Sequence, residues 1–139
     1  MKIEQEVLAE IRVLRDRLRH ATGVLVATAD GLLIAHDTHG IEPEGVAALS
    51  AAHLGLSQRM AHSASHGEFQ ETVTRGRTGY VATFAAGTAA VLTVLAGADL
   101  NVGRLHLEAR PVATRIGAIV AHAIARQQSA GVDHRHERR

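Results

Sequence analysis

The sequence contains no cysteine and no tryptophan, and lysine occurs only once, as Lys2. Without cysteine the chain can form neither disulfides nor thiolate metal sites. Its three aromatic residues, Phe69, Tyr80 and Phe84, are too few for a surface on which nucleic-acid bases could stack. The formal net charge is only +1, so no strong electrostatic attraction draws the chain to nucleic acid or to a membrane surface. These absences argue against a nucleic-acid-binding protein and against a disulfide-stabilised one.

Long hydrophobic runs are also missing. No stretch of about 18 apolar residues occurs, so we expect no membrane-spanning helix. The N-terminal stretch carries charges throughout and lacks the apolar core of a signal peptide, which favours a cytoplasmic protein. The length of 139 residues suits one domain, and 46% of the residues are hydrophobic, so a core can form without cross-links.

The motifs of common enzyme classes do not occur either. Neither a G-x-x-x-x-G-K-[ST] loop nor a G-x-G-x-x-G turn after a strand is present, which argues against a nucleotide hydrolase. No serine lies in a G-x-S-x-G elbow. His62 and His66 have the spacing of a helical zinc pair, but no glutamate follows His62 and no third ligand is evident. We therefore predict no catalytic residue, no metal site and no cofactor.

The most informative stretch that is present covers residues 44–64, EGVAALSAAHLGLSQRMAHSA. Leu49, His53, Leu56 and Met60 recur on one face at helical spacing. Much of the remaining circumference is alanine, serine and glycine, whereas an ordinary surface helix has a narrow apolar stripe and a charged back. We expect a sheet to cover one side of this helix. The other side is covered either by a second copy of the protein or by more of the same domain.

Periodicity and turn residues predict the first half of the chain. Residues 3–18 have the apolar spacing of an amphipathic helix. Asp30 and Gly31 lie between two β-type runs, residues 24–28 and 32–36, which predicts a β-hairpin.

Three more strands are expected in the second half, at residues 69–74, 80–85 and 89–95, of which the last is apolar on both faces and should be central. A final helix begins near Asn101, and Pro111 inside it should kink or divide it. The order α-β-β-α-β-β-β-α predicts an α+β fold, a three-layer α/β/α sandwich around a five-stranded antiparallel sheet. Residues 1–127 form this domain, and residues 128–139 are expected to be a disordered polar tail.

The sequence resembles the roadblock family, whose members are also described as dynein light chains. The resemblance covers about residues 3–124 and rests on the element order, the Asp-Gly hairpin, the small-residue helix and the stretch RGRTGYVATFAAGTAAVLTVLAGADLNVGRLHLEARPVATRIGAIV. Its most telling part is Asn101 and Gly103, followed by Leu105 and residues 107–110. The resemblance implies a noncatalytic dimer in which the long helices of two subunits pack antiparallel and the third strands pair. That third strand, residues 69–74, contains neither proline nor lysine and so lacks the usual protection of an exposed edge. The expected dimer interface comprises Leu49, His53, Leu56, Met60, Phe69, Glu71, Thr72 and Val73.

Bacterial members of the family regulate or scaffold small Ras-like GTPases, and in actinobacteria a similar protein is encoded beside a Ras-like GTPase and a sensor kinase-like protein. The resemblance therefore implies a noncatalytic homodimeric regulator or scaffold of such a GTPase in bacterial signalling. Gln58, Arg59 and His62, which we expect to face outward amid small side chains, are the candidate partner-binding residues. The alternative is a small-molecule-binding sensor module of similar sandwich fold.

Overall fold

The structure is a computed structural model that describes the backbone of residues 2–137 and the side chains of residues 2–130. Its three helices are α1 (Lys2–Arg17), α2 (Pro43–Ser63) and α3 (Val102–Glu137). The predicted order α-β-β-α-β-β-β-α is confirmed. The strands are β1 (Ala21–Thr28), β2 (Leu33–Thr38), β3 (Glu71–Arg75), β4 (Gly79–Ala86) and β5 (Ala90–Gly97).

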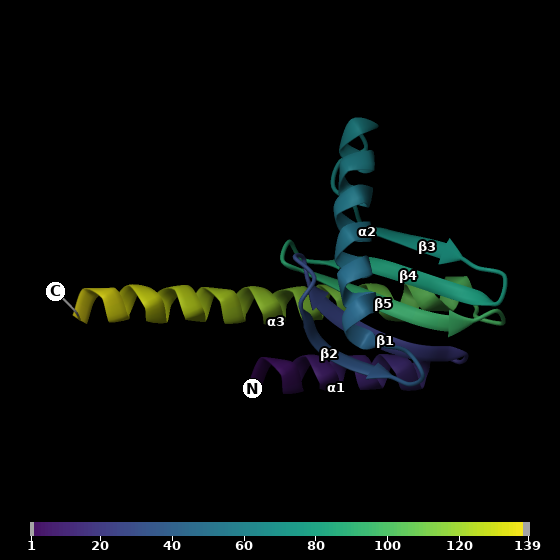
Figure 1. Cartoon of the computed structure of the whole chain (residues 1–139), viewed down its shortest axis with the longest axis horizontal. Coiled ribbons are helices and arrows are strands. Elements are labelled where there is room, and N and C mark those ends of the chain that lie inside the picture. Colours follow the sequence, from purple (N-terminus) through teal and green to yellow (C-terminus); the bar gives the residue numbers. More distant parts are fainter. Residues whose placement is uncertain (1, 138–139) are drawn as a thin grey trace.

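The five strands form one antiparallel sheet in the order β2-β1-β5-β4-β3 (Figure 1). The most apolar strand, β5, is central as predicted and pairs with β1 on one side and with β4 on the other. Asp30 and Gly31 make the turn between β1 and β2, where Gly31 adopts a φ of 99° that a residue with a side chain would rarely take. The two edges of the sheet are β2 and β3.

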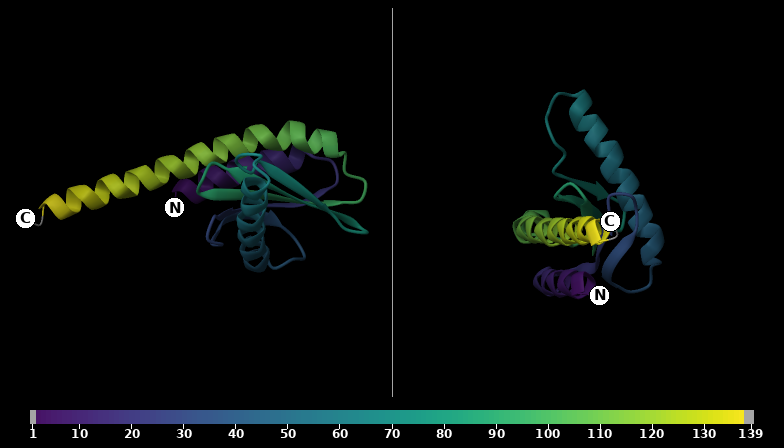
Figure 2. Two further views of the ribbon diagram at one scale, coloured as in Figure 1. Left: turned by 90° about the horizontal axis from the view of Figure 1, so that it is seen from above. Right: turned by 90° about the vertical axis from the view of Figure 1, so that its left-hand side faces the viewer.

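The helices cover the two faces of this sheet unequally. Helices α1 and α3 lie side by side on one face, and α2 alone crosses the other (Figures 1 and 2). The larger core lies under α1 and α3, and a smaller core lies under α2. Alternate residues of the strands point into the two cores, which confirms the three-layer α+β sandwich. Examples are Ile11, Leu14, Phe84, Leu92 and Ile116 in the larger core, and Leu25, Ala47, Leu54 and Val91 in the smaller.

The last helix differs from the prediction in two respects. Asn101 caps it as expected, since its Oδ1 accepts a hydrogen bond from the backbone N–H of Arg104 at 3.0 Å. However, α3 passes through Pro111 as one helix and is not divided there. Pro111 lies on the exposed side of α3, where water can hydrogen-bond the Leu107 carbonyl that proline leaves without a donor.

The second difference is the extent of α3. The helix continues to Glu137 and projects beyond the rest of the fold, through most of the segment that the sequence predicts as a disordered tail (Figure 1). No proline follows Pro111, and alanine, arginine and glutamine are good helix formers, so the sequence has no strong stop signal near residue 127. Residues 138 and 139 of the predicted tail lie outside the described residues.

The turn between β4 and β5 meets α3 at two glycines, which provides a test of the packing. A Cβ atom added to Gly117 would lie 2.6 Å from the backbone nitrogen of Gly87. Gly117→Val is therefore expected to lower the free energy of unfolding by about 1–3 kcal/mol, because the backbone of the β4–β5 turn must move to make room for the side chain. Urea or thermal unfolding followed by circular dichroism measures the change. The neighbouring Ala118→Val, on the exposed side of α3, introduces the same side chain and should change stability far less. Equal destabilisation by both variants would contradict the close contact.

Candidate interaction surface

Helix α2 has one face on the sheet and a second apolar face in solvent. Its inner residues Ala47, Ser50 and Leu54 are buried, and the Thr93 hydroxyl donates a buried hydrogen bond of 2.7 Å to that of Ser50. On the outer face Leu49, Leu56 and Met60 are 71%, 59% and 65% exposed. We call these three residues, together with His53, the α2 stripe. A soluble chain rarely exposes three large apolar side chains in a row without a partner to cover them.

His53 lies at the side of this stripe nearest the sheet. It is partly buried, and its Nδ1 is 3.4 Å from the hydroxyl oxygen of Thr83, which is itself buried on β4. His53 therefore connects α2 to its own sheet and presents only part of its ring outward. The three exposed members of the stripe remain the principal apolar contacts available to a partner.

The sheet under α2 is incompletely covered. The C-terminal part of α2 projects past the β3 edge of the sheet, as Figure 1 shows. Val81 of β4, on the α2 side of the sheet, is 36% exposed, and Thr74 of β3 is exposed as well. An uncovered sheet surface thus lies next to a helix that extends beyond its own subunit.

Strand β3 pairs with β4 on one side, and its other side forms the edge of the sheet. The carbonyl of Gln70 accepts a hydrogen bond from Ala85 at 2.9 Å, and the N–H of Gly76 donates to Gly79 at 2.7 Å. Because hydrogen-bonded pairs alternate along an antiparallel ladder, residue 72 also pairs toward β4. The backbone N–H and C=O of Val73 then face the open edge. The backbone groups of Thr72, which is also in the expected interface, are thus paired within the subunit's own sheet.

Two other residues of the expected interface have contacts within their own subunit. Phe69 lies before β3, not in it, and is 9% exposed in the smaller core, which removes its ring from the surface where we expected it. The chain between α2 and β3 turns back under the end of α2 and brings the ring there. The Glu71 side chain lies on the α3 side of the sheet, where Arg110 Nε and Nη2 donate to it at 2.7 and 3.3 Å and the His106 ring lies against it. The hydrogen bond to Glu71 raises the pKa of Arg110 above its ordinary value, against a smaller opposing effect of desolvation.

The three candidate partner-binding residues lie on the flank of α2. Arg59 and His62 are exposed, whereas Gln58 is partly buried. Gln58 and His62 line a shallow cavity of about 200 Å³ beside the chain that leads to β3, together with Glu68 and Phe69. Arg59 does not line that cavity. All three thus lie near one another outside the α2 stripe, with Arg59 and His62 exposed and Gln58 less exposed than the sequence led us to expect.

The described residues form neither a metal-ligand cluster nor a membrane-spanning helix. In the part of the chain that the structure describes, no three histidine or acidic side chains come together as metal ligands would. Among residues 2–137, no helix is both long enough and apolar enough to cross a bilayer.

Comparisons with known proteins fit the observed architecture. Residues 8–96 match the Roadblock/LC7 domain family. No curated protein matches the sequence. A Roadblock/LC7 domain from Streptomyces avermitilis superimposes with a TM-score of 0.72 at 21% identity, covering 84% of this chain and 96% of that one. Myxococcus xanthus MglB gives 0.78 at 18% identity, covering 86% and 90%. An MglB described with a tetrameric arrangement gives 0.79 at 20% identity, covering 87% and 92%. At such identities the structural similarity shows the fold.

Proposed function

We propose, from the premise that this chain belongs to the Roadblock/LC7 family, that it is a noncatalytic homodimeric regulator or scaffold of a small Ras-like GTPase in bacterial signalling. The observation that carries the proposal is the α2 stripe, whose three large side chains are more than half exposed on a helix that projects past its own sheet. Such a surface fits a protein that acts by contact with other chains.

In the proposed dimer the α2 helices of two subunits pack antiparallel across a two-fold axis, and the two β3 edges pair. The overhanging end of each α2 then covers the open sheet surface near Val81 of the other subunit. Burial of Leu49, Leu56 and Met60 contributes up to about 1.5–3 kcal/mol per fully buried side chain. Because a two-fold interface uses the same surface twice, each of these contributions occurs in both subunits.

A Ras-like GTPase is the proposed partner because the bacterial members of the family regulate or scaffold such proteins. Arg59, exposed next to the covered stripe, is the candidate contact for an acidic group of this partner. Two copies of Gln58, Arg59 and His62, one from each subunit, then frame a two-fold platform. We propose that this chain catalyses no reaction of its own. If it activates its partner, the guanidinium of Arg59 is the group that would assist GTP hydrolysis in trans, by stabilising charge in the transition state.

A pull-down and a GTPase assay test this function, with a small Ras-like GTPase from the same organism in both nucleotide states. We expect wild type to bind, and Arg59→Ala to weaken binding by about tenfold, equivalent to ~1.4 kcal/mol. The matched control is Arg12→Ala, an exposed arginine on α1 and therefore on the other face of the sheet, which should bind normally.

The two readouts separate the parts of the proposal. Absence of binding in either nucleotide state contradicts the proposed function. Binding that leaves the rate of hydrolysis unchanged identifies a scaffold and removes the role of activator. Equal losses in Arg59→Ala and Arg12→Ala contradict the position of the partner-binding surface.

A further inference from the structure

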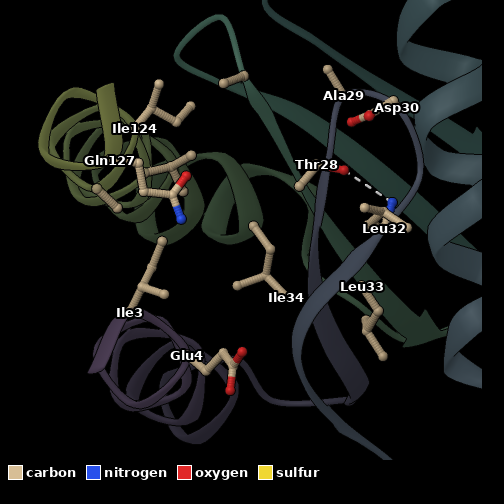
Figure 3. A pocket seen from close by; sticks show the side chains of 13 residues that line it. Ile3, Glu4, Thr28, Ala29, Asp30, Leu32, Leu33, Ile34, Ile124 and Gln127 are labelled. Atoms are coloured by element: carbon tan, nitrogen blue, oxygen red, sulfur yellow. Dashed lines mark hydrogen bonds between the residues drawn. The ribbon is translucent and has the colours of Figure 1, made fainter. Parts of the chain in front are cut away.

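A cavity of about 570 Å³ lies at the hairpin end of the sheet, away from the α2 stripe. Three parts of the chain enclose it: the N-terminal turn of α1, the β1–β2 hairpin and the middle of α3 (Figure 3). Its volume is within the range of small-molecule sites, which is roughly 300–1,000 Å³. Nothing in the proposed dimer or in the proposed GTPase contact uses this cavity.

The apolar side chains of α1 and α3 become less covered toward the cavity. On α1, Val7 and Ile11 are completely buried, whereas Ile3, the preceding apolar residue on the same side of the helix, is only partly buried. On α3, Ile116 is completely buried, and Ile124, about two turns further along the helix, is 38% exposed. Both helices thus continue their apolar sides beyond the core, and the uncovered ends face the same cavity.

The hairpin supplies the third wall. Ile34 of β2 approaches the same space as Ile3 and Ile124 in Figure 3, and Leu32, at the hairpin, is 67% exposed. The Thr28 hydroxyl accepts a hydrogen bond of 3.0 Å from the N–H of Leu32, which fixes this wall before any ligand binds. Because apolar surface in contact with water is unfavourable, a molecule that covers these side chains gains affinity from the hydrophobic effect.

Charged groups of both signs surround the cavity. Glu4 already has an interaction partner, and Asp30 is exposed at the tip of the hairpin, where it can stay hydrated. Lys2 and Arg126 line an adjoining hollow of about 260 Å³, which shares part of its wall with the cavity. A charged ligand of either sign would therefore lose hydration without meeting a net opposite charge. The cavity is thus suited to the apolar surface of an uncharged ligand.

We propose that this cavity binds a small neutral aliphatic molecule, of the size of a medium-chain alcohol. Its chain contacts Ile3, Ile34 and Ile124, and its hydroxyl group pairs with water or with the side-chain amide of Gln127, which also lines the cavity. A small molecule fits better than a protein partner because a stable protein interface needs about 800 Å² on each side. Among the described side chains that line the cavity, the large exposed apolar residues are only Leu32 and Ile124.

The test titrates neutral and charged probes into the full chain and follows backbone amide signals by NMR. We expect 1-octanol to bind with a dissociation constant below about 1 mM, and 1-hexanol, which is two methylene groups shorter, to bind about tenfold more weakly. Octylamine and octyl sulfate keep the chain length of 1-octanol and add a charge of either sign, so both should bind at least about fivefold more weakly than 1-octanol. The largest signal changes should lie at residues 28–34 and 120–127.

Three outcomes of these titrations overturn the proposal. The first is the absence of 1-octanol binding up to about 1 mM. The second is binding of either charged probe as tightly as 1-octanol. The third is a set of signal changes centred on the α2 stripe, which would show that 1-octanol covers any exposed apolar surface.

Two variants assign the cavity. Ala123→Phe fills it from the α3 wall and should abolish binding of 1-octanol, with the circular dichroism spectrum of the wild type. The matched control Ala118→Phe places the same ring on the exposed side of α3 and should bind normally. Ile124→Ala removes part of the wall and should weaken 1-octanol by about tenfold. Unchanged affinity in Ile124→Ala or in folded Ala123→Phe overturns the assignment.

A second copy of the chain is the other occupant that the experiment can detect. If the signals of the cavity residues change on dilution of the protein and not on addition of 1-octanol, a second copy covers the cavity and the proposal is overturned. The α2 variant Leu56→Asp should bind 1-octanol as the wild type does, so failure of the proposed dimer and failure of this site are distinguishable.

Discussion

Leu56→Asp is expected to convert the proposed dimer into a monomer. Leu56 is 59% exposed in the subunit, so an aspartate there can stay hydrated and leave the subunit folded. In the proposed dimer the same carboxylate would be buried without a partner, which costs several kcal/mol, and two-fold symmetry doubles this cost. Light scattering after gel filtration at about 10 µM measures the mass. We expect the dissociation constant of the dimer to rise at least about a thousandfold, which corresponds to ~4 kcal/mol.

The matched control is Leu107→Asp. Leu107 is 66% exposed on α3, on the other face of the sheet, and carries the same side chain. This variant should remain a dimer, and both variants should have the circular dichroism spectrum of the wild type. A wild-type monomer at the same concentration, or a Leu56→Asp variant that is still dimeric, would show that the α2 stripe is not the interface.

The fold could be predicted almost completely from the sequence because its signals are local. The Asp30–Gly31 turn lies between two apolar runs, the apolar spacing of α1 and α2 is regular, and Asn101 is a good cap. Each of these acts through residues a few positions apart, so no knowledge of tertiary contacts is needed. The exposed stripe of α2 follows in the same way, since its residues repeat on one helical face. The end of α3 could not be placed, because the apolar stripe ends near Ile124 while the residues that follow include good helix formers.

The details of β3 could not be predicted from the sequence. Alternation along residues 69–74 would place Phe69 on the same face as Glu71 and Val73, but β3 begins at Glu71 and Phe69 packs in the smaller core under α2. Which backbone groups of β3 face outward depends on its register with β4, which the turn at residues 76–79 sets. The sequence of β3 is compatible with either arrangement because threonine and valine both suit a strand surface.

The cavity at the β1–β2 hairpin end of the sheet also could not be predicted from the sequence. Its apolar lining combines Ile3, Ile34 and Ile124, which lie in three elements far apart along the chain. Each of these isoleucines belongs to the apolar side of its own element and appears there as an ordinary core residue. Only the arrangement of α1, α3 and the hairpin leaves space between them (Figure 3).

The second large expected effect is a loss of dimer stability when the open edge of β3 is changed. In the proposed dimer the backbone N–H of Val73 donates to the β3 strand of the other subunit. Val73→Pro removes this donor from both subunits, which costs two hydrogen bonds of about 0.5–1.5 kcal/mol each, and the proline ring also separates the two edges. We expect the dissociation constant of the dimer to rise at least about tenfold, as measured by sedimentation equilibrium over a dilution series. The subunit should stay folded, since proline is tolerated where its nitrogen faces the open side of an edge strand.

Thr72→Pro is the informative comparison, because the same substitution one residue earlier acts on a different hydrogen bond. By the alternation of the ladder, the N–H of Thr72 bonds to β4 within the subunit, so this variant should lower the midpoint of thermal unfolding of the subunit itself. Val73→Ala keeps the N–H and shortens the partly buried side chain, and it should therefore retain the dimer while losing some stability. A Val73→Pro variant with wild-type dimer affinity would exclude β3 pairing from the interface. If instead Thr72→Pro weakens the dimer with no loss of subunit stability, the register is reversed and Thr72 is the residue whose backbone faces the partner.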